Sequence, residues 1–172
     1  MKIGIIADTH DNLRHLDKAI QYFNREKIGL LLHCGDWIMP FTMEMFKELK
    51  CPIKGVLGNG DPDIQKFQYQ LQNKFQDLDL ELSEIFLDLT VEGKRIAVFH
   101  GNDEHLIKAI VESRLYEVFC HGHTHQAKIE KRQKTLIINP GSLDGVHLPD
   151  KAAPITVAIY DTAIDKAEIV SL

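Results

Sequence analysis

The chain has 172 residues, of which 44% are hydrophobic and 26% are charged, and its net charge is −5. This length predicts a single domain, 1–172, with a well-buried core, and the composition is that of an ordinary globular protein. The acidic balance argues against stable nucleic-acid binding, which needs a basic face.

The first half of the chain alternates short apolar runs with amphipathic stretches. Lys2–Ala7 is typical of a buried strand and is too short for a signal peptide or a membrane span. Helical spacing follows over 13–23, a second strand is predicted at Ile28–His33, and a second helix over 41–49 precedes the strand Ile53–Leu57. This order predicts an α/β fold with right-handed crossovers.

The second half of the chain is richer in strands. A third helix is predicted over 63–76, and a fourth around 106–111. Alternation over 85–91 predicts a strand with one buried face, paired as a hairpin with Arg95–Phe99. Further strands are predicted at Tyr116–Cys120, Ala127–Glu130, Thr135–Ile138, Ile155–Tyr160 and Lys166–Val170. Parallel units followed by hairpins predict two packed sheets with helices outside.

Potential metal ligands directly follow the predicted strands. They lie in the turns Asp8-Thr9-His10, Gly35-Asp36, Gly58-Asn59, His100-Gly101 and His121-Gly122-His123. In an open α/β sheet the carboxyl ends of the strands form the ligand-binding edge, so these side chains are expected to gather there. Carboxylate, imidazole and amide donors without thiolate favour Mn²⁺, Fe or Zn²⁺ over Ca²⁺ or an iron–sulfur cluster.

These motifs resemble those of the calcineurin-like metallophosphoesterases. They are Asp8-x-His10, Gly35-Asp36, Gly58-Asn59-x-Asp61, His100-Gly101 and Gly122-His123-Thr124-His125, over a stretch from Lys2 to about Ser142. The run His33-Cys34-Gly35-Asp36 and the turn Asn139-Pro140-Gly141-Ser142 are similar to those of the compact bacterial and archaeal phosphodiesterases. The resemblance implies an α/β (α+β) fold: a four-layer αββα sandwich of two mixed β-sheets flanked by helices.

The resemblance also implies two divalent metal ions, with Mn²⁺ expected first and Fe, Zn²⁺ or Ni²⁺ as alternatives. One ion would be held by Asp8, His10, Asp36 and His123, and the second by Asp36, Asn59, His100 and His121, with Asp36 bridging the two. Asp36, Asn59 and His123 would be central to catalysis. The implied reaction is hydrolysis of a phosphate ester, foremost a small phosphodiester or nucleotide-like substrate, by in-line attack of a metal-bridging hydroxide.

Other polar residues are expected around the ligands. Asp61 is predicted to orient the Asn59 turn or cap the following helix, and His125 to support the ligands rather than bind an ion. Asn139 and Ser142 have a structural and a substrate-facing interpretation with equal weight. Gly60 stands where many family members carry a histidine proposed to protonate the leaving group or bind the phosphate. We therefore expect a preference for good leaving groups, or help from His125 or a metal-bound water.

The remaining histidines and cysteines have simpler interpretations. His33 is predicted as a hydrogen-bonded core residue, and His15 is predicted on the surface. Cys34 and Cys120 are predicted as packing residues. The chain has 3 cysteines and no C-x-x-C pair, which makes a disulfide framework unexpected and a reducing cytoplasm the simplest setting.

The alternative function is a protein-interaction scaffold that resembles the retromer subunit of the same fold. A scaffold is free to lose metal ligands, whereas every expected ligand position here carries a suitable side chain. A purely structural metal site fits poorly because structural zinc sites are closed, four-coordinate and often built from cysteine. A homo-oligomer is compatible with the family, but no surface stripe in the sequence identifies an interface.

Overall fold

The structure is a computed structural model that describes residues 1–147 and 151–172. Its larger sheet has six strands in the order β13-β12-β1-β2-β3-β4. The strands are β1 (Lys2–Ile6), β2 (Leu30–His33), β3 (Ile53–Val56), β4 (Leu80–Ser83), β12 (Thr156–Asp161) and β13 (Lys166–Ser171). Strands β1 to β4 run parallel, while β12 and β13 are antiparallel additions beside β1. The larger sheet is therefore mixed.

The second sheet has five strands in the order β5-β6-β7-β9-β8. Its strands are β5 (Phe86–Val91), β6 (Lys94–Phe99), β7 (Val118–Cys120), β8 (Lys128–Arg132) and β9 (Thr135–Asn139). Strands β6, β7 and β9 are parallel, and β5 and β8 each add an antiparallel hairpin partner at an edge. A short two-stranded sheet, β10 (Val146–His147) with β11 (Lys151–Ala152), lies outside both.

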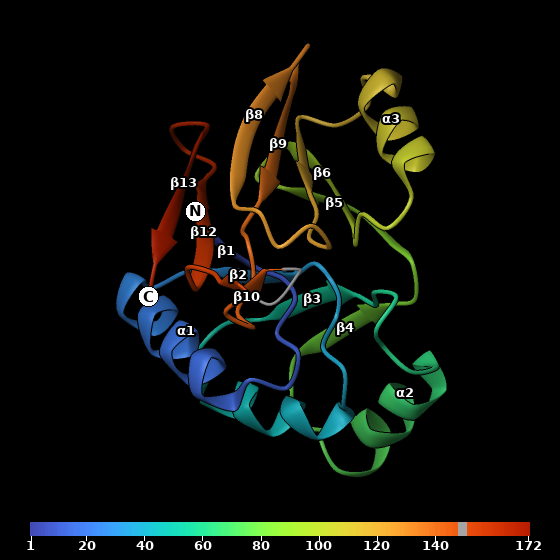
Figure 1. The fold of residues 1–172 in the computed structure, drawn as a ribbon, viewed down its shortest axis with the longest axis vertical. Helices are drawn as coiled ribbons and strands as arrows, with labels where there is room; N and C mark the ends of the chain where they lie inside the picture. Colours follow the sequence, from blue (N-terminus) through green and yellow to red (C-terminus); the bar gives the residue numbers. More distant parts are fainter. Residues whose placement is uncertain (148–150) are drawn as a thin grey trace.

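Helices cover the outer faces of the two sheets (Figure 1). The larger sheet carries α1 (Leu13–Glu26), the 3₁₀ helix η1 (Pro40–Glu48) and α2 (Ile64–Asn73), and the smaller one carries α3 (Glu104–Ser113). The side chain of Asn12 caps α1 by accepting a hydrogen bond from the His15 N–H. Within residues 1–147 and 151–172, no helix combines the length and the apolar character needed to span a membrane.

Three hydrophobic layers separate the four layers of secondary structure. Phe23, Trp37 and Phe46 belong to the layer between the helices and the larger sheet. Ile5 and Val98 belong to the layer between the two sheets, and a third layer joins α3 to the smaller sheet. Alternate residues of β1 face opposite layers, as the two-residue period of a strand requires. The predicted αββα sandwich is therefore confirmed.

Close packing explains one glycine of β1. A Cβ atom on Gly4 would lie 2.6 Å from Ile28 Cδ1 and 2.9 Å from Phe23 Cε1. Both neighbours belong to the layer beneath α1, so any larger residue at this position would push the helix off the sheet. The closeness of α1 to β1 fixes where the turn after β1 begins, and this turn carries Asp8.

The structure differs from the sequence-based expectations in a few elements. The second helix is a 3₁₀ helix, and β4 was not predicted as a strand. His15 was expected on the surface but is half-buried, with its Nδ1 atom 2.7 Å from the Leu143 carbonyl oxygen. The packing role predicted for Cys34 and Cys120 is confirmed, because both are buried and free.

Candidate metal centre

The expected ligands lie where strands of both sheets end. Asp8 follows β1, Asp36 follows β2 and Asn59 follows β3, all in the larger sheet. His100 follows β6 and His123 follows β7, both in the smaller sheet. The turn after β1 is held against the turn after β2 by hydrogen bonds from the Asp8 and Thr9 N–H groups to the Gly35 and Asp36 carbonyls. The centre is thus built between the two sheets.

The backbone at these strand ends adopts an unusual conformation. Asp8, His10 and Asp36 have φ values of 51°, 43° and 58°, and His123 and His125 have 68° and 56°. Such left-handed conformations are sparsely populated by residues other than glycine, and they concentrate at functional sites where the surrounding structure enforces them. The turns are therefore shaped to aim their side chains inward.

Asp36 lies between two imidazoles. Its Oδ2 atom is 3.4 Å from His10 Nε2, and its Oδ1 atom is 3.4 Å from His100 Nε2. The Gly60 N–H donates a hydrogen bond of 2.8 Å to Oδ1. Burial alone would raise the pKa of Asp36, but the contacts with His10 and His100 outweigh burial and hold the pKa below its usual range. The carboxylate is therefore charged, and both of its oxygens face the site.

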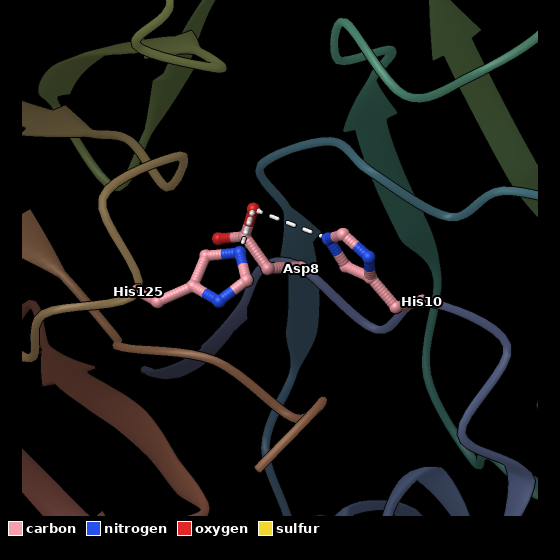
Figure 2. Close-up of side chains that lie close together, drawn as sticks. All are labelled: Asp8, His10 and His125. Carbon is pink, nitrogen blue, oxygen red and sulfur yellow. Dashed lines mark ion pairs between the residues drawn. The ribbon is translucent and has the colours of Figure 1, made fainter. Parts of the chain in front are cut away.

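Asp8 is also placed between two imidazoles (Figure 2). Its Oδ1 atom lies 3.4 Å from His125 Nε2 and 4.0 Å from His10 Nε2. Its Oδ2 atom accepts a hydrogen bond of 3.0 Å from the His123 N–H. The contact with Asp8 raises the pKa of His125 to about 9, and contact with Asp36 raises that of His10.

The opposite side of the site joins His100, Asn59 and His123. Asn59 Oδ1 lies 3.1 Å from His100 Nε2, and the rings of His100 and His123 meet edge to face with centroids 5.1 Å apart. The Nδ1 atom of His100 lies 2.8 Å from the Cys34 carbonyl oxygen. Donation of the Nδ1 proton to this carbonyl leaves Nε2 free to bind a cation. Burial lowers the pKa of His123, which favours the neutral, ligating form.

The chemistry of the site fits a cation. Among the described residues, the buried side-chain atoms without a hydrogen bond are Asp8 Oδ1 and His10 Nε2. Two groups of potential ligands have their atoms within 4.8 Å of one another: Asp8, His10 and His125, and Asp8, Asp36 and His100. Unpartnered buried polar atoms are costly, and a divalent ion would satisfy them. The residues present therefore fit the expected metals.

Two histidines lie differently from what the motifs led us to expect. His125, expected only to support the ligands, faces Asp8 and His10. His121 was expected as a ligand. The His121 ring stacks on Phe119, with centroids 5.3 Å apart, and lines a cavity between α3 and the smaller sheet. As predicted, strand β7 ends at Cys120, and the left-handed residues His123 and His125 then turn the chain, so the three histidines do not share one face.

Asp61 holds the loops that carry Asp36 and Asn59. Its carboxylate accepts hydrogen bonds from the N–H groups of Asp36, Ile38 and Gly58 at 3.0, 2.7 and 2.7 Å. Burial nevertheless raises the pKa of Asp61. The carboxylate thus joins the turn after β2 to the turn after β3, which fits its expected orienting role.

Asn139 and Ser142 bind the backbone of the ligand turns. Asn139 Nδ2 donates to the Gly122 carbonyl at 2.9 Å and to Thr124 Oγ1 at 3.0 Å. The Ser142 hydroxyl donates to the Asp8 carbonyl at 3.0 Å. Both side chains are buried. Of the two interpretations left open by the sequence, these contacts favour the structural one.

His33 and Thr9 support the turn that carries Asp36. The ring of His33 is buried, stacks on Trp37 with centroids 3.6 Å apart, and lies 3.2 Å from Thr9 Oγ1. Thr9 Oγ1 also donates to the Asp36 carbonyl at 3.2 Å. The predicted core role of His33 is confirmed, while the part that Thr9 plays was missed, because threonine in a turn carries no signal of its own.

A two-sheet sandwich with carboxylates, imidazoles and an amide at its strand ends agrees with the phosphoesterase class that the motifs resemble. The family model of the calcineurin-like phosphoesterase superfamily domain matches residues 1–165. The chain therefore belongs to the calcineurin-like phosphoesterase superfamily.

Individual relatives agree with this membership. A phosphodiesterase of Methanocaldococcus jannaschii is 34% identical over 146 residues, which are 84% of this chain and 86% of the relative. The structure of an archaeal phosphodiesterase superimposes with a TM-score of 0.90 at 31% identity and covers 100% of both chains. Vps29 of Entamoeba histolytica, solved with Zn²⁺, shares the fold with a TM-score of 0.67 at 17% identity, over 99% of each chain.

Proposed function

We propose that the protein is a dinuclear metal-dependent phosphodiesterase. One ion would be held by Asp8, His10, Asp36 and His125, and the second by Asp36, Asn59, His100 and His123, with Asp36 shared. The observation that carries this proposal is the pair of buried carboxylates, each flanked by two imidazoles, in which the Asp8 Oδ1 and His10 Nε2 atoms lack a hydrogen bond. The relatives named as phosphodiesterases support a phosphodiester substrate.

The proposed ligands change the roles expected from the motifs. His125 takes the place expected for His123, and His123 takes the place expected for His121, because His125 faces Asp8 and His123 faces His100. His125 is then occupied as a ligand and is no longer available as the proton donor that Gly60 cannot supply. We infer that the enzyme favours esters whose leaving group needs no protonation by a side chain.

Two divalent ions in such a site lower the pKa of water and stabilise charge on phosphate oxygens during an in-line displacement. The chain's own residues prepare the site. Asp36 keeps its charge because His10 and His100 contact it, and His100 keeps Nε2 free because Nδ1 is bound to the Cys34 carbonyl. Mn²⁺ is the proposed metal, with Fe, Zn²⁺ and Ni²⁺ as alternatives.

The substrate, the domain organisation and the cellular location are also proposals. We infer a small phosphodiester or nucleotide-like substrate, a single catalytic domain, and a cytoplasmic setting for an enzyme with free, buried cysteines. A homo-oligomer is compatible with these proposals. A scaffold role remains the competing function, since Vps29 proteins share the fold.

The experiment that tests the proposal is a metal-reconstitution assay. The protein is stripped with a chelator, reloaded with Mn²⁺ or another divalent ion, and assayed on bis(4-nitrophenyl) phosphate and on 4-nitrophenyl phosphate. We expect two bound ions per chain and an activity that returns with metal and favours the diester. Asp36→Asn should lose both the bound ions and the activity. Asp88→Asn is the matched control, because Asp88 is exposed and paired with Arg95. Two bound ions without turnover of either ester would favour the scaffold.

A further inference from the structure

Ile38 adopts a backbone conformation that is rare for its side chain. Its φ is 78°, in the left-handed region that β-branched residues avoid. The conformation is held by Asp61, whose Oδ1 atom accepts the Ile38 N–H at 2.7 Å while its Oδ2 atom accepts the Asp36 N–H at 3.0 Å. One carboxylate therefore fixes Ile38 relative to the proposed bridging ligand.

The side chain of Ile38 occupies the space beside Gly60. A Cβ atom on Gly60 would lie 2.9 Å from Ile38 Cδ1 and 3.2 Å from Oδ1 and Cγ of Asp36. A side chain at position 60 and the isoleucine at position 38 thus compete for the same volume over the Asp36 carboxylate. Gly60 has no side chain, and the aliphatic side chain of Ile38 fills this edge of the site instead.

This edge is open to substrate. Asn59, Gly60 and His123 are exposed, whereas Asp8 and Asp36 are buried beneath them. A phosphate ester that reaches the carboxylates therefore approaches past Asn59 and Gly60, and one of its ester groups meets Ile38. An apolar group gains by covering this side chain, whereas a polar group loses water there without a replacement hydrogen bond.

Apolar surface continues from Ile38 along the chain. Met39, Phe41 and Tyr69 are 47%, 49% and 64% exposed and line a groove of about 640 Å³ between η1 and α2. The Met39 N–H donates to Asp11 Oδ1 at 2.9 Å, which ties the start of this groove to the turn that carries His10. The groove therefore begins at the residue that follows Ile38.

We propose that Ile38 determines substrate specificity: it presents an apolar wall to one ester group of the phosphodiester, and that group extends into the groove of Met39, Phe41 and Tyr69. The substrate class is then a phosphodiester with an apolar, aryl-type ester group. The proposal rests on the proposed phosphodiesterase activity and narrows its substrate.

The first test compares two diesters of methyl phosphate, with 4-chlorophenyl and 4-carbamoylphenyl groups. The two phenols are similar in acidity and differ in polarity. We expect the Mn²⁺-loaded protein to prefer the chlorophenyl ester about tenfold in kcat/KM, as one apolar contact typically provides. Ile38→Gly and Ile38→Ala should both remove this preference, and Ile38→Val should keep most of it.

Controls separate specificity from folding and metal loading. Glycine tolerates the φ of Ile38, so metal-free Ile38→Gly should unfold at a temperature no lower than that of the wild type. Metal content measured by elemental analysis should match the wild type in each variant. Ile164→Ala removes an apolar side chain that is 62% exposed in the turn between β12 and β13, and should leave the preference unchanged.

The second test measures the coupling of positions 38 and 60. Gly60→His should reduce activity about tenfold when Ile38 is present, and should cost little in the Ile38→Gly background, because the volume is then free. Equal effects in both backgrounds, or an unchanged chlorophenyl preference in Ile38→Gly with full metal content, would overturn the assignment. A wild-type protein that hydrolyses neither diester with any metal would instead overturn the phosphodiesterase proposal on which it rests.

Discussion

The two sheets supply chemically different halves of the site. The larger sheet provides the carboxylates of Asp8 and Asp36, the amide of Asn59 and the imidazole of His10, while the smaller sheet provides imidazoles alone: His100, His123 and His125. The fixed negative charge of the site thus comes entirely from the larger sheet, and most of the imidazoles come from the smaller one. The site exists only where the sheets meet, so anything that binds it also joins the two halves of the sandwich.

The largest expected effect comes from removing an imidazole of the smaller sheet. His125→Ala should lose one ion and at least about 10²-fold in activity, because residues that merely support a ligand already cost 10–100-fold. His121→Ala is the matched control, since its ring lines the cavity behind the site. It should keep both ions and most of the activity. Loss of an ion in His121→Ala but not in His125→Ala would restore the ligand set expected from the motifs.

Removal of the metals should loosen the contact between the halves. At a metal concentration a hundred times the Kd, binding of one ion stabilises the folded state by about 2.7 kcal/mol. For a chain of this size, loss of one ion corresponds to a fall in Tm of roughly 5–10 °C on adding chelator, and loss of both ions to about twice that. Differential scanning calorimetry with and without Mn²⁺ measures this shift. A Tm that does not change while the ions leave would show that the sheets are packed independently of the site.

Within the larger sheet, Asp61 should matter more for its charge than for its shape. Asp61→Asn keeps the size of the side chain but turns one acceptor into a donor that faces a backbone N–H. We expect the free energy of unfolding to fall by about 1–3 kcal/mol. Activity should fall by about 10–100-fold through misplacement of Asp36. Urea denaturation measures the loss of stability and kcat/KM measures the loss of activity, with Asp88→Asn as the exposed comparison. Wild-type activity in Asp61→Asn would mean that Asp61 does not position Asp36.

The smallest expected effect is a pH dependence of the metal-free protein. The folded-state pKa of His125 is raised to about 9 by Asp8, whereas an unfolded histidine titrates near 6.5. The folded state therefore holds this proton more tightly. The pair stabilises the protein fully below pH 6.5, and the contribution is lost as the pH rises to about 9. Because the His125 ring is partly open to solvent, the pair should contribute only about 1 kcal/mol to the free energy of unfolding.

Urea denaturation at pH 6 and pH 9.5 measures this dependence. His10 and His100 also have raised pKa values and act in the same direction, so the comparison must be made against a variant. His125→Gln should reduce the difference between the two pH values by the expected amount. An identical difference in wild type and variant would mean that His125 and Asp8 do not interact in the folded protein.

Much of the fold could be predicted from the sequence because the strands are short apolar runs that end in polar turns. The predicted strands and the hairpin of β5 and β6 are confirmed. Strand β4 was missed because its alternation of apolar and polar residues over Leu80–Ser83 is short, and pairing with β3 is what makes it a strand. The 3₁₀ character of η1 could not be foreseen, since its apolar spacing fits either helix type.

The sequence was enough to predict which turns carry the ligands of the candidate site, but not where each histidine ring points. Alternate residues share a face only while a strand lasts, so the spacing of His121, His123 and His125 does not tell which rings face the carboxylates after β7 ends at Cys120. The half-buried position of His15 was equally hidden, because its partner Leu143 lies 128 residues away in sequence. Local pattern locates the turns, whereas backbone dihedrals and distant partners decide where each ring points.

The hydrogen bond from Ser142 to the Asp8 carbonyl has a consequence for the order of events during synthesis. Strand β1 pairs on one side with β12, so the backbone of the first ligand turn acquires its last partners only after most of the chain has been made. At roughly 5–20 residues per second, the ribosome needs on the order of ten seconds to half a minute to add the 134 residues that separate Asp8 from Ser142. During that interval the edge of β1 that later pairs with β12 has no partner strand. The complete ligand turn can therefore form only late in the synthesis of the chain.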